Sequence, residues 1–424
     1  MMTPQDSETL TRVGPGTKMG AMMREYWIPA ASSAEVAIGR PPLRLMLLGE
    51  KLVAFRDAKG RVGVMDQRCP HRCASLFLGR NEGDGLRCVY HGWKFDVEGS
   101  CLEMPNVPAH QDFKDRVKAR AYRVFERNGL IWVYMGARAE PPAPPAIEAT
   151  LLPDPWRHLC LVQRECNWLQ ALEGEIDTSH FGFLHAGHLD PATMSPSDPN
   201  YYTVLNRTPE YHFAETDCGT MYAAYRDADA ANVYWRFAHF MFPFWTLIPA
   251  GEFATDIIAR AWVPIDDTHT MFFMLSSRPI LVPKLLPNSS DWYGRWRSAD
   301  NERNDYGIDR EAQLRNESFT GIASIHLQDQ AVTESMGPII DHQLETLAPS
   351  DLMIVQTRRR ILRAVEAHAS QGTVPPGVDQ PDVYLDARGG QFLTPRGVEW
   401  RDAYRQKLAV ATRANALAGS AAAQ

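Results

Sequence analysis

The sequence predicts an α+β protein, in which an all-β N-terminal module precedes a larger domain that mixes helices and strands. Short apolar segments between residues 45 and 66, at 121–125 and at 130–135 indicate strands joined by polar turns. The stretch 141–145, Pro-Pro-Ala-Pro-Pro, then indicates a stiff surface linker. Because 424 residues exceed what one core comfortably holds, we expect separate domains on either side of it.

The all-β module carries two short pairs that each combine a cysteine with a histidine, Cys69-Pro-His71 and Cys88-Val-Tyr-His91. Two cysteines on one iron and two histidines on the other are the ligands of a Rieske [2Fe-2S] centre, which passes single electrons. Structural zinc is the alternative, but zinc fingers usually separate a cysteine pair from a histidine pair. The interleaved pairs therefore favour the iron–sulfur cluster.

Composition and charge exclude several function classes. The net charge of -7 gives no basic surface for nucleic acid or for an anionic membrane, and 45% hydrophobic with 22% charged residues is ordinary for a globular protein. No apolar run reaches the roughly 18 residues that a membrane-spanning helix needs, and residues 1–8 do not resemble a secretory signal. We therefore expect a cytoplasmic protein.

The larger domain carries an acid and two histidines within residues 167–185, which we expect to be helical. Asp177 and His180 are three residues apart and share a helix face. His180 and His185 are five apart, which separates them by about 140° on a regular helix, so binding one ion requires a break, for which Gly182 is the expected point. Two histidines and one carboxylate form the facial triad of Fe(II) sites, which leaves positions open on the ion; surface or capping histidines are the alternative.

From Cys69-Pro-His-Arg to Cys88-Val-Tyr-His-Gly-Trp-Lys-Phe-Asp96, the chain resembles the Rieske non-haem iron oxygenases, specifically their large (alpha) terminal oxygenase subunits. The likeness runs from about Tyr26 to the region of Arg358 and is strongest to the phthalate dioxygenase-like branch, which contains aromatic-acid dioxygenases, aryl-ether-cleaving enzymes and O-demethylases. Cys73 is a departure, since the branch usually has glycine there.

The resemblance implies an all-β Rieske domain followed by an α+β catalytic domain, whose antiparallel sheet and helices are of the helix-grip, or START-like, type. We accordingly expect an N-terminal segment at 1–25, the Rieske domain at 26–140, the proline-rich linker at 141–155, the mononuclear iron domain at 156–410 and an alanine-rich tail at 411–424.

The family pattern of an aspartate, a histidine three residues later and a second histidine five further on carries over to Asp177, His180 and His185. It implies that the two histidines bind the mononuclear Fe(II), with His188 as a rival ligand. It also implies that Asp177 bridges an iron-ligating histidine and a cluster histidine of the neighbouring subunit, as in the homotrimers or stacked hexamers of this family. A carboxylate partner is usual for a ligating histidine.

The carboxylate ligand of the iron must come from another segment. Residues 324–337 resemble the branch segment that supplies it, and Asp329 is the expected ligand, with Glu334 as the alternative.

A carboxylated substrate would require a fixed guanidinium, which binds a carboxylate through two hydrogen bonds. Arg207, Arg226 and Arg236 are the candidates, and a surface salt bridge is the alternative for each. Arg236 belongs to the segment Tyr234–Pro249, which is too aromatic and too interrupted by proline for a helix. We expect strands there that form a sheet core, a pocket wall, or both.

The resemblance implies a terminal oxygenase that uses O2 to oxidise an aromatic carboxylic acid, by ring dihydroxylation or by O-demethylation or aryl ether cleavage, in aromatic catabolism. An NADH-dependent reductase, with or without a ferredoxin, would supply the electrons from another chain, since no nicotinamide or flavin fingerprint is evident here. The alternative is a Rieske electron-transfer protein without oxygenase activity. The roughly 280 residues after the linker argue against it, because they suffice for a further domain.

Overall fold

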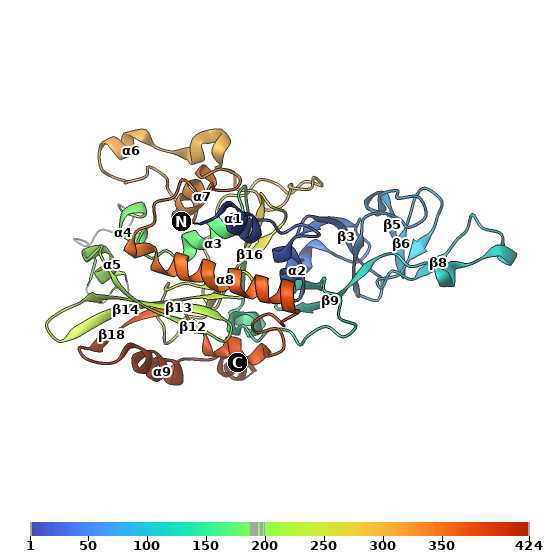
Figure 1. Ribbon diagram of the computed structural model, residues 1–424. Helices are drawn as coiled ribbons and strands as arrows, with labels where there is room; N and C mark the ends of the chain where they lie inside the picture. Colours follow the sequence, from blue (N-terminus) through green and yellow to red (C-terminus); the bar gives the residue numbers. More distant parts are fainter. Residues whose placement is uncertain (1, 187–193, 196–197, 199, 423–424) are drawn as a thin grey trace. The chain divides into compact units, whose positions relative to one another are not determined.

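The computed structural model describes residues 2–186, 194–195, 198 and 200–422 (Figure 1). The chain divides into two compact units. The larger unit comprises Met1–Arg12, Ala143–Pro287 and Trp296–Gln424, and the smaller unit comprises Val13–Pro142 and Asn288–Arg295. The N-terminal segment is therefore shared between the two units, and an eight-residue stretch from the second half of the chain joins the smaller one.

The smaller unit consists mainly of short antiparallel strands. One sheet has six strands in the order β1-β10-β9-β4-β3-β2, and the other has four in the order β5-β6-β7-β8. The elements are α2 (Lys18–Arg24), β1 (Trp27–Ser32), β2 (Leu43–Leu47), β3 (Glu50–Arg56), β4 (Val62–Asp66), β5 (Arg80–Glu82), β6 (Gly85–Arg87), β7 (Lys94–Phe95), β8 (Cys101–Glu103), β9 (Ala121–Arg127) and β10 (Leu130–Tyr134). The strands predicted between 45 and 66 and after 121 are confirmed.

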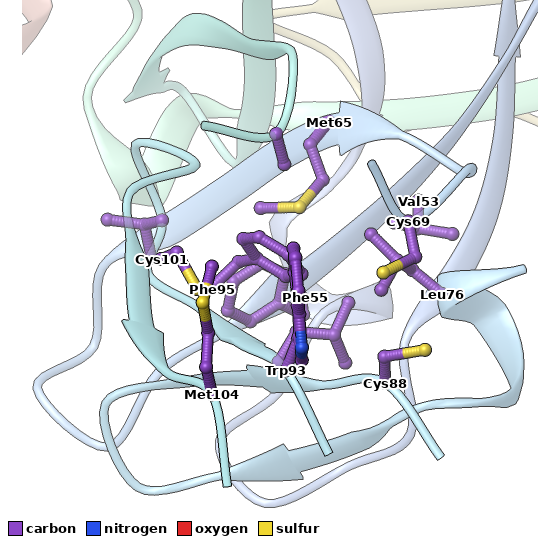
Figure 2. Close-up of a cluster of buried hydrophobic side chains, with 13 residues drawn as sticks. Val53, Phe55, Met65, Cys69, Leu76, Cys88, Trp93, Phe95, Cys101 and Met104 are labelled. Carbon is purple, nitrogen blue, oxygen red and sulfur yellow. The ribbon is translucent and has the colours of Figure 1, made fainter. Parts of the chain in front are cut away.

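A hydrophobic core receives side chains from both of these sheets. Phe55 comes from β3 of the first sheet and Phe95 from β7 of the second, and both are at most 1% exposed. Cys69 and Cys88 belong to the same core, and Figure 2 shows them on one side of it, beyond Trp93. The core therefore fixes the two cysteines against a rigid apolar base.

The larger unit is built on an eight-stranded antiparallel sheet. Seven strands follow the order β11-β17-β16-β15-β14-β13-β12, and β18 pairs with β14. The strands are β11 (His158–Arg164), β12 (Glu210–Thr216), β13 (Gly219–Asp227), β14 (Asn232–Met241), β15 (Trp245–Leu247), β16 (Ile258–Pro264), β17 (Thr270–Ser276) and β18 (Gly390–Pro395). The helices are α1 (Pro4–Thr11), α3 (Trp168–Ile176), α4 (Phe181–Leu184), α5 (Tyr201–Leu205), α6 (Arg310–Leu314), α7 (Ile325–Ser335), α8 (Leu352–Gln371), α9 (Trp400–Val410) and α10 (Ala414–Ala422).

The two faces of this sheet are covered by different helices. The long helix α8 packs on β12 and β13, while α9 packs on the opposite face, where Trp400 joins a core that contains Phe237 (Figure 1). Residues alternate between the faces along a strand, so Arg236 lies on the face away from α9. The predicted strands in the segment 234–249 are confirmed as β14 and β15.

Helices α3 and α7 pack closely on the face away from α9. Gly174 in α3 faces Thr333 in α7, where an added Cβ would lie 3.0 Å from the threonine methyl group. The Gln170 side chain of α3 donates to the Thr333 carbonyl at 2.9 Å. These contacts fix the end of α3 beside α7, and both helices lead into the site described below.

The prediction of a helix over 167–185 that breaks at Gly182 is wrong about where the break lies. Helix α3 ends at Ile176, Asp177 has an extended backbone, and Gly182 lies inside the short helix α4. The Asp177 carboxylate accepts the Ser179 N–H at 2.6 Å, which is an Asx turn. This local hydrogen bond competes with helical backbone hydrogen bonds. The helix therefore ends before Asp177, several residues before the break that the histidine spacing indicated.

Candidate metal centres and active-site cavity

The two cysteine–histidine pairs of the smaller unit lie on two loops with the same backbone pattern. The Cys73 N–H donates to the Cys69 carbonyl at 2.9 Å, and the Gly92 N–H donates to the Cys88 carbonyl at 3.0 Å. The residue that closes each loop has a positive φ, 59° at Cys73 and 78° at Gly92. A left-handed backbone favours glycine, so Cys73 occupies a position that is strained for a cysteine.

The loops bring cysteine beside cysteine and histidine beside histidine. Cys69 and Cys88 are at most 2% exposed and interact directly, whereas the partly exposed rings of His71 and His91 have centroids 4.4 Å apart. Burial raises the pKa of the Cys69 thiol to about 12, and Cys88 contributes further to this rise. Thiols of this kind become thiolates when a metal displaces their protons. A buried sulfur pair and an outer imidazole pair fit the donor set of a Rieske cluster.

His180, His185 and Asp329 meet in the larger unit, where their ligand atoms all lie within 4.8 Å of one another. The histidines flank α4, one at each end, and Asp329 lies in α7. Asp329 Oδ1 is 3.7 Å from His180 Nε2 and 3.3 Å from His185 Nε2. The three residues predicted from separate segments are therefore together, and two imidazoles with one carboxylate fit Fe(II).

The sequence left Glu334 as the alternative carboxylate and His188 as the alternative histidine. Glu334, the alternative carboxylate, is buried elsewhere, where it accepts hydrogen bonds from the Glu165 N–H at 2.9 Å and the Tyr306 hydroxyl at 2.8 Å. Its side chain therefore connects α7 to Glu165 and Tyr306 and is not directed at the two histidines. His188 lies outside the described residues.

The outer ring nitrogen of His180 faces Asp177, with Nδ1 3.5 Å from the carboxylate Oδ2. Burial lowers the pKa of His180, but Asp177 and the charge of Asp329 outweigh burial and raise it overall. Burial likewise raises the pKa of Asp329, but the neighbouring imidazoles of His185 and His180 outweigh burial and lower it to about 2. Asp329 is thus an anion beside the two imidazoles, and Asp177 faces His180 from the position where a carboxylate usually orients a ligating histidine.

His185 has a neutral outer partner that the sequence did not reveal. Its Nδ1 lies 2.6 Å from Gln328 Oε1, and both side chains are at most 1% exposed. The Gln328 amide nitrogen donates to the Ile322 carbonyl at 2.8 Å and the Thr320 hydroxyl at 2.9 Å. Because a carbonyl only accepts, the amide oxygen must face His185, whose Nδ1 must carry the proton. The Nε2 lone pair is then free for a metal.

A cavity of about 700 Å³ opens beside this centre. Its described lining includes Asp177, His180, His185 and Asp329 of the predicted centre, together with apolar groups such as Phe181, Ile248 and Val282. A mostly apolar cavity with a few converging charges is typical of small-molecule sites. Its cationic lining residues are Arg236, Arg260 and Lys284.

The three arginines predicted to bind a carboxylate are in different places. Arg236 lines the cavity, whereas Arg207 lies over the Phe183 ring, 5.1 Å from its centroid, outside that lining. Arg226 is 3% exposed and donates to the Asn206 carbonyl at 2.6 Å. Burial lowers the pKa of Arg226 to about 10, and the charge of Arg236 lowers it further. Arg226 and Arg236 are thus two neighbouring buried guanidiniums, of which Arg236 lines the cavity.

Arg260 and Glu175 also line the cavity and were missed in the sequence. Arg260 lies in β16 and Glu175 in the last turn of α3, and the two form an ion pair. Glu175 lies two residues before Asp177, and this closeness to a predicted site residue could have indicated that Glu175 belongs to the site. Nothing local to β16 distinguishes Arg260 from a surface arginine.

Comparison with known proteins agrees with this arrangement. The Rieske [2Fe-2S] domain family matches residues 26–119, and the family described as LigXa C-terminal domain like matches residues 133–422. The 3-chlorobenzoate-3,4-dioxygenase oxygenase subunit of Comamonas testosteroni is 51% identical over 96% of this chain and 99% of its own length. The phthalate 4,5-dioxygenase oxygenase subunit of Pseudomonas putida is 36% identical, over 95% of this chain and 94% of its own.

Solved structures share the fold. Dicamba monooxygenase bound to dicamba superposes with a TM-score of 0.57 at 18% identity, covering 83% of this chain and 100% of that one. NdmA of Pseudomonas putida CBB5 gives 0.55 at 20% identity, covering 90% and 100%. Both support the predicted order of an all-β domain followed by an α+β domain.

The chain therefore belongs to the Rieske non-haem iron oxygenases, as a large terminal oxygenase subunit of the phthalate dioxygenase-like branch. Membership confirms the expected enzyme class and the expected [2Fe-2S] and mononuclear iron cofactors. The match over 133–422 disfavours a pure electron carrier. Among the described residues, no helix has the length and apolar character needed to cross a membrane.

Proposed function

We propose that this chain is the oxygenase component that oxidises an aromatic carboxylic acid with O2, using electrons that an NADH-dependent reductase, with or without a ferredoxin, draws from NADH. The observation that carries the proposal is the cavity in which Arg236 and the His180–His185–Asp329 centre share one lining. A fixed guanidinium recognises a carboxylate, and the apolar lining accepts a ring.

The residues that hold the two metal centres follow from the donor sets. Cys69 and Cys88 would hold one iron of the cluster, and His71 and His91 the other. His180, His185 and Asp329 would hold the mononuclear iron. When bound, the cluster supplies single electrons and the mononuclear iron supplies the capacity to use O2.

The chain's own residues bind and orient the substrate. Arg236 lies with its guanidinium over the Phe181 ring, 4.5 Å from the centroid, and donates to the Thr203 hydroxyl at 3.0 Å. Its Nε has no hydrogen-bond partner within the part of the chain that the structure describes. No carboxylate among the described residues is paired with Arg236. A substrate carboxylate at this guanidinium would supply the missing anion and fix the ring in the cavity.

Ring dihydroxylation is the reaction we propose, because the relative at 51% identity is named as a dioxygenase acting on 3-chlorobenzoate. O-demethylation is the second candidate, since a 5,5'-dehydrodivanillate O-demethylase oxygenase subunit of Sphingobium is 33% identical over 86% of this chain. The two reactions give different products. Ring dihydroxylation gives a cis-diol, whereas O-demethylation of a methoxylated aromatic acid releases formaldehyde.

Electron transfer between the centres would pass between subunits. Asp177 is the proposed bridge, because one carboxylate can accept from the outer nitrogen of an iron-ligating histidine and from a cluster histidine. His91 Nδ1 is buried and has no hydrogen-bond partner among the described residues, which suits it to hold the cluster iron and leaves Nε2 as the nitrogen for a carboxylate of the neighbouring subunit. The proposed assembly is a homotrimer or a stack of two trimers, in the cytoplasm, with the smaller unit as the Rieske domain and the larger unit as the catalytic domain.

Metal analysis and EPR of the purified protein test this assignment. We expect about three irons per chain, the sum of a two-iron cluster and one mononuclear ion, and a rhombic signal after dithionite reduction. With the reductase and NADH, benzoate or 3-chlorobenzoate should stimulate O2 consumption with product formation. Bound zinc in place of the cluster, or no oxygenated product despite three irons, would contradict the proposal.

A further inference from the structure

The cavity contains a second guanidinium whose charge is already neutralised. One nitrogen of Arg260, Nη1, contacts both carboxylate oxygens of Glu175, and the contact with Oε2 is 2.5 Å. The two side chains are only 9% and 7% exposed. An ion pair this sheltered from water is screened little by salt, so Glu175 occupies Arg260 persistently.

Arg260 and Arg236 lie on the same face of the sheet. Arg260 in β16 pairs with Thr246 in β15, and Thr246 pairs with Phe240 in β14. Phe240 is four residues from Arg236, and side chains an even number of residues apart point to the same face. The cavity thus has a guanidinium without a carboxylate partner among the described residues, Arg236 in β14, and a paired one, Arg260 in β16, with β15 between the two strands.

This difference sets how many carboxylates the cavity accepts. A single carboxylate can bind at Arg236. A second carboxylate at Arg260 would lie beside the Glu175 carboxylate that already contacts Nη1, and two like charges in a sheltered site repel each other. Lys284 is the remaining lysine or arginine of the described lining, but it is exposed, where ion pairs contribute little.

We infer that Glu175 is a specificity-determining residue, which restricts the cavity to aromatic monocarboxylates by occupying Arg260. The inference rests on the proposed function, because it takes the cavity to be an aromatic-acid site. It predicts that neutralising Glu175 frees Arg260 and admits an aromatic dicarboxylate.

The test is calorimetric titration of the oligomeric holoenzyme, under anaerobic conditions, with benzoate and with benzene-1,3-dicarboxylate. The wild type should bind benzoate at least tenfold more tightly than the diacid. Glu175→Gln keeps the size of the side chain and one acceptor for Arg260 while removing the negative charge. It should shift the ratio of the two dissociation constants toward the diacid by at least tenfold.

Two further variants separate this effect from a general disturbance. Adding Arg260→Met to Glu175→Gln should abolish the shift, because the second carboxylate loses its partner. Glu215→Gln is the matched control, since Glu215 is an acid of the same unit in β12, exposed and paired with Arg363 outside the cavity lining. It should leave the ratio unchanged. The cluster absorbance and bound iron of each variant report on folding.

The outcomes distinguish this inference from the function on which it rests. Equal binding of the two acids by the wild type, a comparison that needs no variant, would overturn the role of Glu175 and leave the proposed function standing. An unchanged ratio in a folded Glu175→Gln protein would do the same. Failure of the wild type to bind either acid would overturn the proposed function and this inference together.

Discussion

Replacing Gln328 with leucine tests how α7 prepares His185 for a metal. Gln328 accepts the Nδ1 proton of His185 at 2.6 Å and so leaves Nε2 unprotonated toward Asp329. In Gln328→Leu the imidazole loses this acceptor. The favoured tautomer then carries its proton on Nε2, where it can donate to the Asp329 carboxylate, and that proton blocks the metal.

The expected loss can be estimated in two ways. A buried donor left without its acceptor costs about 1–3 kcal/mol, and losing the outer partner of a ligating histidine typically weakens metal binding by about 10–100-fold. At about 1.4 kcal/mol per tenfold change, the second estimate corresponds to about 1.4–2.8 kcal/mol. The two ranges agree, so we expect the Fe(II) dissociation constant of Gln328→Leu to rise about 10–100-fold.

Equilibrium dialysis against buffered Fe(II) under argon measures this directly, as iron bound beyond the two cluster irons. Gln330→Leu is the matched control: Gln330 lies in the same helix, is 3% exposed and donates to Glu334 at 2.8 Å, away from the metal ligands. It should destabilise α7 and keep its Fe(II) affinity within about twofold. Gln328→Glu, which retains an acceptor, should bind iron nearly as well as the wild type. Equal losses in both leucine variants, or no loss in either, would refute the tautomer argument.

Three further predictions concern other parts of the chain. Cys73→Gly should raise the midpoint of thermal cluster bleaching by a few degrees, because removing the Cβ relieves about 1 kcal/mol at a φ of 59°; Gly92→Ala, whose Cβ would lie 2.6 Å from Pro105, should lower it. Burial lowers the pKa of His269, but Asp266 and Glu165 outweigh burial and raise it to about 9. The stabilisation, about 3 kcal/mol at most, is complete below the ordinary histidine pKa of about 6.5 and is lost as pH rises through about 9. The difference in melting temperature between wild type and His269→Gln should therefore shrink between pH 6 and pH 10, and a constant difference would contradict the assignment. Asp177→Asn should retain the cluster and the mononuclear iron while rapid-mixing kinetics show electron transfer between them slowed by about 100-fold; normal turnover with intact oligomers would exclude the bridging role.

The residues proposed as metal ligands were accessible from sequence because metal chemistry imposes short, recognisable spacings. The pairs at 69–71 and 88–91 each lie in one loop, and His180 and His185 are only five residues apart along the chain. Asp329 required the family pattern, since 144 residues separate it from His185 and only the packing of α7 against α3 brings the two together. The strands were predictable from alternation and turn residues.

The parts that escaped prediction depend on tertiary contacts. The helix ends at Ile176 because the Asp177 side chain bonds its own backbone, a local competition that histidine spacing does not encode. Gln328 shows its role only once His185, Thr320 and Ile322 surround it. The pairing of Arg260 with Glu175 across 85 residues, and the absence of such a partner for Arg236 among the described residues, likewise follow from the sheet and from α3.

A single-turnover reaction tests the central claim most directly. The purified chain, loaded with Fe(II), reduced with dithionite and freed of reductant, is mixed with benzoate or 3-chlorobenzoate and ¹⁸O2 without any reductase. If it is the oxygenase for an aromatic monocarboxylate, the reduced-cluster EPR signal disappears as a cis-diol containing two ¹⁸O atoms forms, in an amount comparable to the mononuclear iron. Loss of the cluster signal with no oxygenated product from either acid would contradict the account.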